Sequence, residues 1–110
     1  MKNILSLLLL LLAFTACGDK KAVTDVLNRS EALMSEHPDS SLNLLRTLTF
    51  DDFQKEKNRA RYALLHSQAL DKNYIDVTSD SLISVAVEYY KDKDDMRSKF
   101  LSYYYMGRVH

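Results

Sequence analysis

The sequence predicts an all-α protein in which antiparallel helix pairs are stacked into a helical array. Apolar residues recur at spacings of three and four along most of the chain after residue 21, which is the pattern of amphipathic helices. The 110 residues include only 2 glycines and 1 proline, so the composition is poor in the residues that form tight β-turns. The polar breaks between the apolar segments are short, and short breaks join antiparallel neighbours.

The first helix pair is expected to occupy residues 22–48. The first helix is predicted over residues 22–36, and His37–Pro38 ends it because the residue before a proline is pushed out of the α region. Asp39 is expected to cap the second helix with its carboxylate. The inner stripe of that second helix is Leu42, Leu44, Leu45 and Leu48.

A third helix is expected to start from a cap at Asp51 or Asp52 and to run to about Lys72, with Phe53 on its inner face. Three small residues on it allow a neighbouring backbone to approach closely: Ala60, Ala63 and Ala69. The mostly basic, solvated shoulder of this helix consists of Lys55, Glu56, Lys57, Arg59 and Arg61.

The fourth helix is expected after a loop over residues 73–79, with Ser79 or Asp80 as its cap. Its β-branched residues suit a strand, but two sets of apolar residues fit helical spacing. These sets are Leu82-Ala86-Tyr89 and Ile83-Val87-Tyr90. No second strand is predicted to pair with it, so a helix is favoured.

The fifth helix is expected to begin at a cap on Asp94 or Asp95. Gly107 within it predicts a place where another helix crosses closely. Tyr105 is predicted to lie opposite the core stripe and is therefore the candidate partner-binding residue. The predicted core stripe is Met96, Phe100, Leu101, Tyr103, Tyr104, Met106 and Val109. No following helix covers this aromatic face, so residues 22–110 are expected to hold two helix pairs and the first helix of a third, as the N-terminal part of a longer protein.

The first 16 residues have the layout of a secretory signal peptide. A lysine at position 2 precedes an apolar run from Ile4 to Phe14, and small residues follow. The run is shorter than the roughly 20 residues that a spanning helix needs. Cys17, the single cysteine, directly follows Ala16, and this arrangement resembles a bacterial lipobox, although Phe14 stands where that family usually has leucine. The resemblance implies that Cys17 is lipidated and that residues 17–21 form a tether; an ordinary signal peptide with a stray cysteine is the alternative.

The charge balance and the absence of certain motifs argue against several classes of function. The chain has 15 Lys and Arg against 15 Asp and Glu, so there is no basic surplus for nucleic-acid binding by counterion release. The histidines, His37, His66 and His110, do not occur in metal-ligand spacing, and no cofactor is expected. No phosphate-binding glycine loop or nucleophile motif is present. The sequence therefore does not suggest an enzyme.

The helix pairs resemble the tetratricopeptide repeat. Tyr103-x-x-Met106-Gly107-x-x-His110 is similar to the first helix of such a repeat, with His110 where the family prefers tyrosine. The segment from Ala32 to Leu45 resembles the start of tetratricopeptide-type bacterial lipoproteins. Helix spacing departs from a regular 34-residue array, so the repeats are expected to be degenerate.

These resemblances imply a lipid-anchored scaffold that binds a protein or peptide in the cell envelope. Gly18 follows the cysteine in place of aspartate, which by the sorting rule of enteric bacteria implies the outer membrane of a Gram-negative bacterium. The alternative is the sensory or dimerising N-terminal part of an envelope signalling or transcription-regulating protein.

Overall fold

The computed structural model describes residues 18–109, which form five α-helices and no strand. The predicted signal peptide over residues 1–16, Cys17 and His110 lie outside the described residues. The all-helical class is confirmed for the part of the chain that is described. Its elements are α2 (Lys21–Leu33), α3 (Pro38–Leu45), the 3₁₀ turn η1 (Phe50–Asp52), α4 (Glu56–Lys72), α5 (Ser81–Tyr90) and α6 (Met96–Val109).

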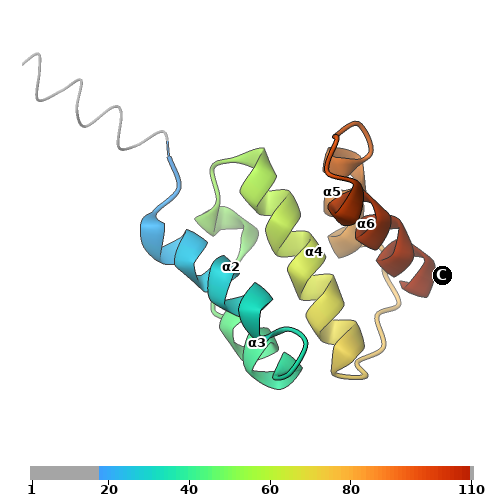
Figure 1. The fold of residues 1–110 in the computed structure, drawn as a ribbon, viewed down its shortest axis with the longest axis horizontal. Coiled ribbons are helices and arrows are strands. Elements are labelled where there is room, and N and C mark those ends of the chain that lie inside the picture. Colours follow the sequence, from blue (N-terminus) through green and yellow to red (C-terminus); the bar gives the residue numbers. More distant parts are fainter. Residues whose placement is uncertain (1–17, 110) are drawn as a thin grey trace, which may run out of the picture.

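Helix α4 is the central element. It contacts every other described α-helix, while α2 packs on α3 and α5 packs on α6. Figure 1 shows α2, α4 and α6 in that order across the front of the molecule, with α5 behind α6. The helices at the two ends of this row are therefore separated by α4, and each keeps one side that no described helix covers.

The turn between α2 and α3 is longer than predicted, because α2 ends before residue 36, and its proline has a different role. Helix α2 ends at Leu33, and Pro38 is the first residue of α3, with His37 at the N-cap position. Proline suits this first position because its fixed φ is helical and the missing N–H would have no helical partner there. The expected cap at Asp39 is thus wrong, since Asp39 lies within the first turn of α3.

The segment before α4 also differs from the prediction. Asp51 and Asp52 belong to η1 and do not cap α4. Asp52 Oδ2 accepts a hydrogen bond from the backbone N–H of Thr49 at 2.8 Å, which closes the turn on itself. Phe53 follows in extended conformation and is 2% exposed, so it enters the core from a loop and not from the helix.

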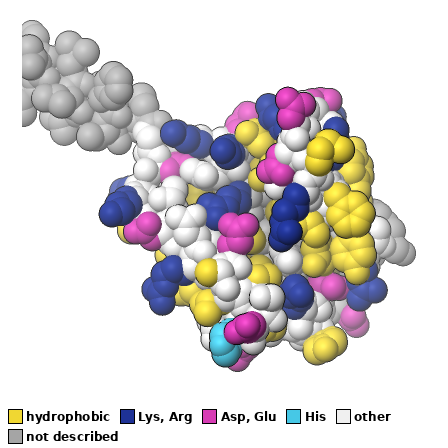
Figure 2. Space-filling model, in the orientation of Figure 1, with side chains coloured by type: hydrophobic (Ala, Val, Ile, Leu, Met, Phe, Trp, Pro, Cys, Tyr) yellow, Lys and Arg dark blue, Asp and Glu magenta, His cyan; other side chains and the backbone are white. Residues whose placement is uncertain are grey.

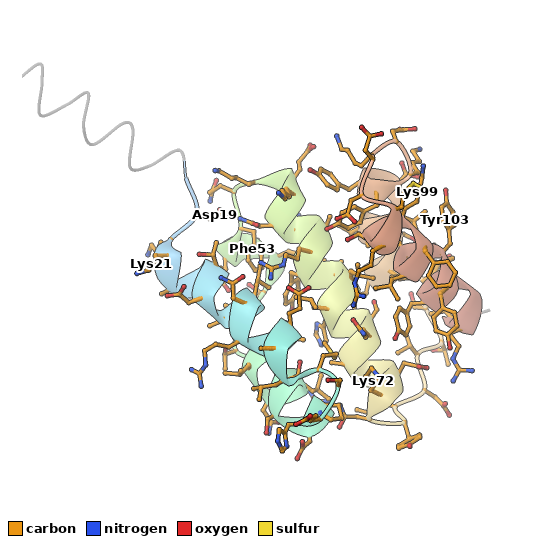
Figure 3. All side chains as sticks on the ribbon, in the orientation of Figure 1. Asp19, Lys21, Phe53, Lys72, Lys99 and Tyr103 are labelled. Carbon is orange, nitrogen blue, oxygen red and sulfur yellow. The ribbon has the colours of Figure 1, made fainter. Side chains whose placement is uncertain are left out.

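Asp19 fixes the start of the described chain to the start of α4. Its carboxylate accepts hydrogen bonds from the backbone N–H groups of Gln54 and Lys55 and from Asn58 Nδ2. Partial burial raises the pKa of the Asp19 carboxyl, but the hydrogen bonds together lower it more, so the pKa lies below its ordinary value. Figure 3 shows Asp19 at the same end of the molecule as Phe53.

The core has one apolar cluster on each side of α4. Ala60, Ala63 and Ala69 are 0% exposed, which confirms the predicted close approach of neighbouring helices. The first cluster, shared with α2 and α3, includes Leu27, Met34, Leu42, Leu45, Phe53, Tyr62 and Leu65. The second, shared with α5 and α6, includes Ala60, Ala63, Leu64, Ile83, Ala86, Tyr90 and Tyr105.

The last two helices begin as predicted. Segment Ser81–Tyr90 is helical, and Asp80 occupies its N-cap position. Asp95 caps α6, because its carboxylate accepts hydrogen bonds from the Ser98 backbone N–H at 3.0 Å and from the Ser98 hydroxyl at 2.8 Å. These bonds lower the pKa of the Asp95 carboxyl.

Candidate binding surfaces

The structure corrects the predicted orientation of α6 in part, because Leu101, Met106 and Val109 of the predicted stripe pack against the second apolar cluster but the rest of the stripe does not. Tyr105, predicted to face away from the core, is 6% exposed and belongs to the second apolar cluster. Its ring meets that of Tyr104 edge to face, with 5.0 Å between the ring centroids. Burial raises the pKa of the Tyr105 hydroxyl. The prediction that Tyr105 contacts a partner therefore loses its basis.

Four side chains of the predicted core stripe of α6 are exposed instead. Met96 and Phe100 are each 68% exposed, Tyr103 is 51% exposed and Tyr104 is 49% exposed. The expectation of an uncovered aromatic face on this helix is correct for the described residues. Figure 2 shows hydrophobic side chains gathered at the edge of the molecule where α6 lies.

A groove lies on the face formed by α2, α4 and α6, with a volume of about 500 Å³. Its apolar lining comes from Met34, Leu64, Leu65 and Leu101. Its charged lining is mainly basic, with Lys55, Lys57, Arg61 and Arg97 against Glu31 and Asp95, and Asn58, Gln68 and Ser98 add neutral polar groups. Figure 2 shows lysine and arginine side chains on this front face.

Both carboxylates of the groove are already engaged. Glu31 on α2 accepts a charged hydrogen bond from Arg61 on α4, with 2.6 Å between the two atoms. Asp95 accepts its bonds from Ser98. The three remaining cations, Lys55, Lys57 and Arg97, form no ion pair within 4.0 Å among residues 18–109. The groove therefore has more positive than negative charge beside apolar surface, although Lys57 and Arg97 lie close enough to Asp95 to help lower the pKa of its carboxyl.

Tyr90 contributes a neutral phenol to the same groove. It is 5% exposed, and burial raises the pKa of its hydroxyl. The hydroxyl therefore stays protonated near neutral pH, and it already interacts with the Ser98 side chain. The donors that the groove offers to a ligand are mainly those of lysine and arginine.

A second, smaller cavity of about 250 Å³ lies where the loop between α4 and α5 meets α6. Arg108 Nε donates to Asp71 Oδ1 at 3.0 Å beside it, and Tyr105 contributes to its wall. Its charged lining residues are already paired or acidic. It offers less unpaired charge to a ligand than the groove does.

His66 has a structural role in the described fold. It is half-buried on α4, and its Nδ1 lies 3.2 Å from the hydroxyl of Tyr62. That hydroxyl donates its one proton to the carbonyl of Leu48 at 3.1 Å, so the Nδ1 of His66 carries the hydrogen of the pair. Burial, and then the positive charge of Arg46, lowers the pKa of the His66 ring.

Among residues 18–109, no group of three or more histidine, cysteine or acidic side chains could hold a metal ion. No helix in this range is both long and apolar enough to cross a membrane.

The sequence predicted most of the basic residues of the groove, but not the helix arrangement that brings them together. The basic shoulder of the third predicted helix contains Lys55, Lys57 and Arg61. Its convergence with Arg97 depends on how α4 and α6 lie together, and no local pattern encodes that.

Comparison of the chain with protein-family models, curated proteins and solved structures finds no match. The groove and the exposed face of α6 are therefore described by their geometry alone.

Proposed function

We propose that the chain is a lipid-anchored helical-repeat scaffold of the bacterial cell envelope that binds a peptide segment of another protein. The repeats would be tetratricopeptide-like, and the anchor would be a lipid on Cys17. The signal-peptide pattern before Cys17 supports the lipid anchor. The succession of helices and short connections from α2 to α6 supports the repeat architecture.

The observation that carries the binding proposal is the groove along α4. It combines an apolar lining with three cations that have no ion pair among the described residues. Such a surface favours an extended peptide that has apolar side chains and carboxylates. Helical arrays present concave surfaces of this kind to proteins.

The binding test uses two labelled peptides that share an apolar pattern and contain prolines, which prevent helix formation. One has glutamates and the other has lysines at the same positions. We expect the full chain, held in nanodiscs of zwitterionic lipid, to bind the glutamate peptide at least about tenfold more tightly by fluorescence anisotropy. Lys57→Glu should remove that preference.

A matched control is Lys21→Glu, which makes the same charge change on an exposed residue of α2 outside the groove. It should leave the preference intact. Equal binding of the two peptides, or an equal loss in both variants, would contradict the groove as the site.

The anchor is tested separately by growth with labelled palmitate. The wild-type chain should incorporate the label, and Cys17→Ala should not. Label on the Cys17→Ala chain would reject lipidation at this cysteine.

A further inference from the structure

The exposed side of α6 forms a narrow apolar stripe, here called the α6 stripe. It consists of Met96, Phe100, Tyr103, Tyr104 and Gly107. These positions follow helical spacing along the whole length of the helix, so they share one side of it. The rings of Phe100 and Tyr104 are stacked, with 6.3 Å between their centroids.

The α6 stripe is continuous with the core of the protein. Leu101 and Met106 lie on the same helix and pack against the second apolar cluster while remaining partly exposed. A helix docked on the stripe would thus extend an apolar cluster that already exists.

Gly107 leaves room at one end of the stripe. A Cβ atom built on this residue would meet no heavy atom within 4 Å. No described helix therefore makes the close crossing that the glycine predicted, and the space remains open to an added backbone. Close approach of a second helix is easiest where the first has no side chain.

The charges that α6 itself carries beside the stripe have one sign. By the 3.6-residue repeat of the helix, Lys99 lies at one edge, and Arg97 and Arg108 lie at the other. Helix α6 contains no acidic residue. Arg108 is paired with Asp71, whereas Arg97 and Lys99 form no ion pair within 4.0 Å among the described residues.

We propose that the α6 stripe binds an amphipathic helix whose apolar side is flanked by aspartate or glutamate. The stripe runs along one side of α6, and its basic edges complement acidic flanks. This site is separate from the groove, although Arg97 borders both.

A second copy of this chain fits the stripe less well. When two α6 helices pair antiparallel about a two-fold axis, each edge of the stripe meets the same edge of the other copy. Lys99 would then face Lys99 of the other copy. Like charges in such positions oppose association.

A bilayer surface also fits less well. Figure 3 shows Tyr103 on the opposite side of the molecule from Asp19, which lies near the start of the described chain. A membrane attached at the N-terminal end would leave the α6 stripe facing away from it.

The experiment uses the full chain in nanodiscs of zwitterionic lipid. The probes are two helical peptides with the same leucine and alanine stripe, one with glutamate flanks and one with lysine flanks. Fluorescence anisotropy should show at least about tenfold tighter binding of the glutamate-flanked helix. Empty nanodiscs give the background.

Two variants test the location and the sign of the charge. Phe100→Asp should weaken binding of the glutamate-flanked helix about tenfold or more, because it places a carboxylate in the stripe. Lys99→Glu should shift the preference toward the lysine-flanked helix. Tyr74→Asp is the matched control, since Tyr74 is a 95% exposed aromatic residue in the loop after α4, and it should change binding less than about twofold.

Circular dichroism melting curves establish that each variant is folded before binding is compared. Lys57→Glu, which alters the groove, should leave the helical probe bound, so failure of the groove proposal is distinguishable from failure of this one. Equal affinity for the two helices would overturn the inference, as would an unchanged affinity in folded Phe100→Asp. Pairing of nanodiscs through two copies of the chain, or tighter binding to anionic vesicles than to the helix, would also overturn it.

Discussion

The hydroxyl of Ser41 on α3 donates a hydrogen bond to the backbone carbonyl of Ser30 on α2, at 2.8 Å. Both residues are 0% exposed. The bond therefore joins the first two helices inside the core, where a polar group without a partner is costly.

Ser41→Ala should lower the free energy of unfolding by about 1 kcal/mol, because it removes this buried donor. Ser40→Ala is a matched control on the same helix, since Ser40 is exposed and both changes gain the same helix propensity. The difference between the two variants in urea denaturation isolates the bond. If the two variants are equally stable, the contact contributes nothing.

Tyr105→Ala should destabilise the protein by roughly 2–4 kcal/mol, since it empties a buried aromatic site in the second cluster. Tyr104→Ala on the next residue should cost less than about 1 kcal/mol because half of that side chain is exposed. Thermal or urea unfolding measures both. A larger loss at Tyr104 would mean that α6 has the orientation first expected from the sequence.

The Asp19 carboxylate should contribute stability that depends on pH. Its pKa is lowered in the folded chain, so the contribution is complete above the unfolded value of about 3.9 and disappears as the pH falls through the folded value. Asp19→Ala should lose roughly 0.5–1 kcal/mol at neutral pH, and the gap from wild type should close in acid. Asp25→Ala, at an exposed position of α2, should show a smaller gap.

His66 should make the fold less stable as the solution is acidified. Its pKa is lowered in the folded chain, so protonation favours the unfolded state once the pH falls below about 6.5, and the penalty is complete below the folded pKa. Urea denaturation between pH 7.5 and 5.5 should show the decline. His66→Gln should flatten it, whereas His37→Gln, at an exposed position, should not.

Helix identity was predictable because it depends on local spacing. The segment Ser81–Tyr90 is rich in β-branched residues, yet its three- and four-residue periodicity correctly predicted a helix. Asp95 also caps as predicted, because a cap acts within its own turn.

The start of α4 was not predictable in the same way. Two aspartates precede it, and either looks like a cap, but Asp52 closes its own turn. The carboxylate that bonds the start of this helix belongs to Asp19, 39 residues before Asn58 in the chain. Such a partner becomes visible only when the chain is folded.

The predicted orientation of α6 was wrong at Tyr105 for another reason. Both sides of this helix have large, partly apolar side chains, with Phe100 and Tyr104 on one side and Leu101 and Tyr105 on the other. Periodicity then indicates two sides that could be buried and does not say which one meets α4 and α5. The small residue Ser102, which is 0% exposed, was the available signal for the packed side.

The bonds made by Asp19 also limit how the protein could stand at a surface. If Cys17 is acylated, the lipid is only two residues from a point fastened to the body of the domain. So short a connection would restrict rotation of the domain relative to the lipid. The domain would then keep a narrow range of tilts above the bilayer, with its far end directed away from the membrane.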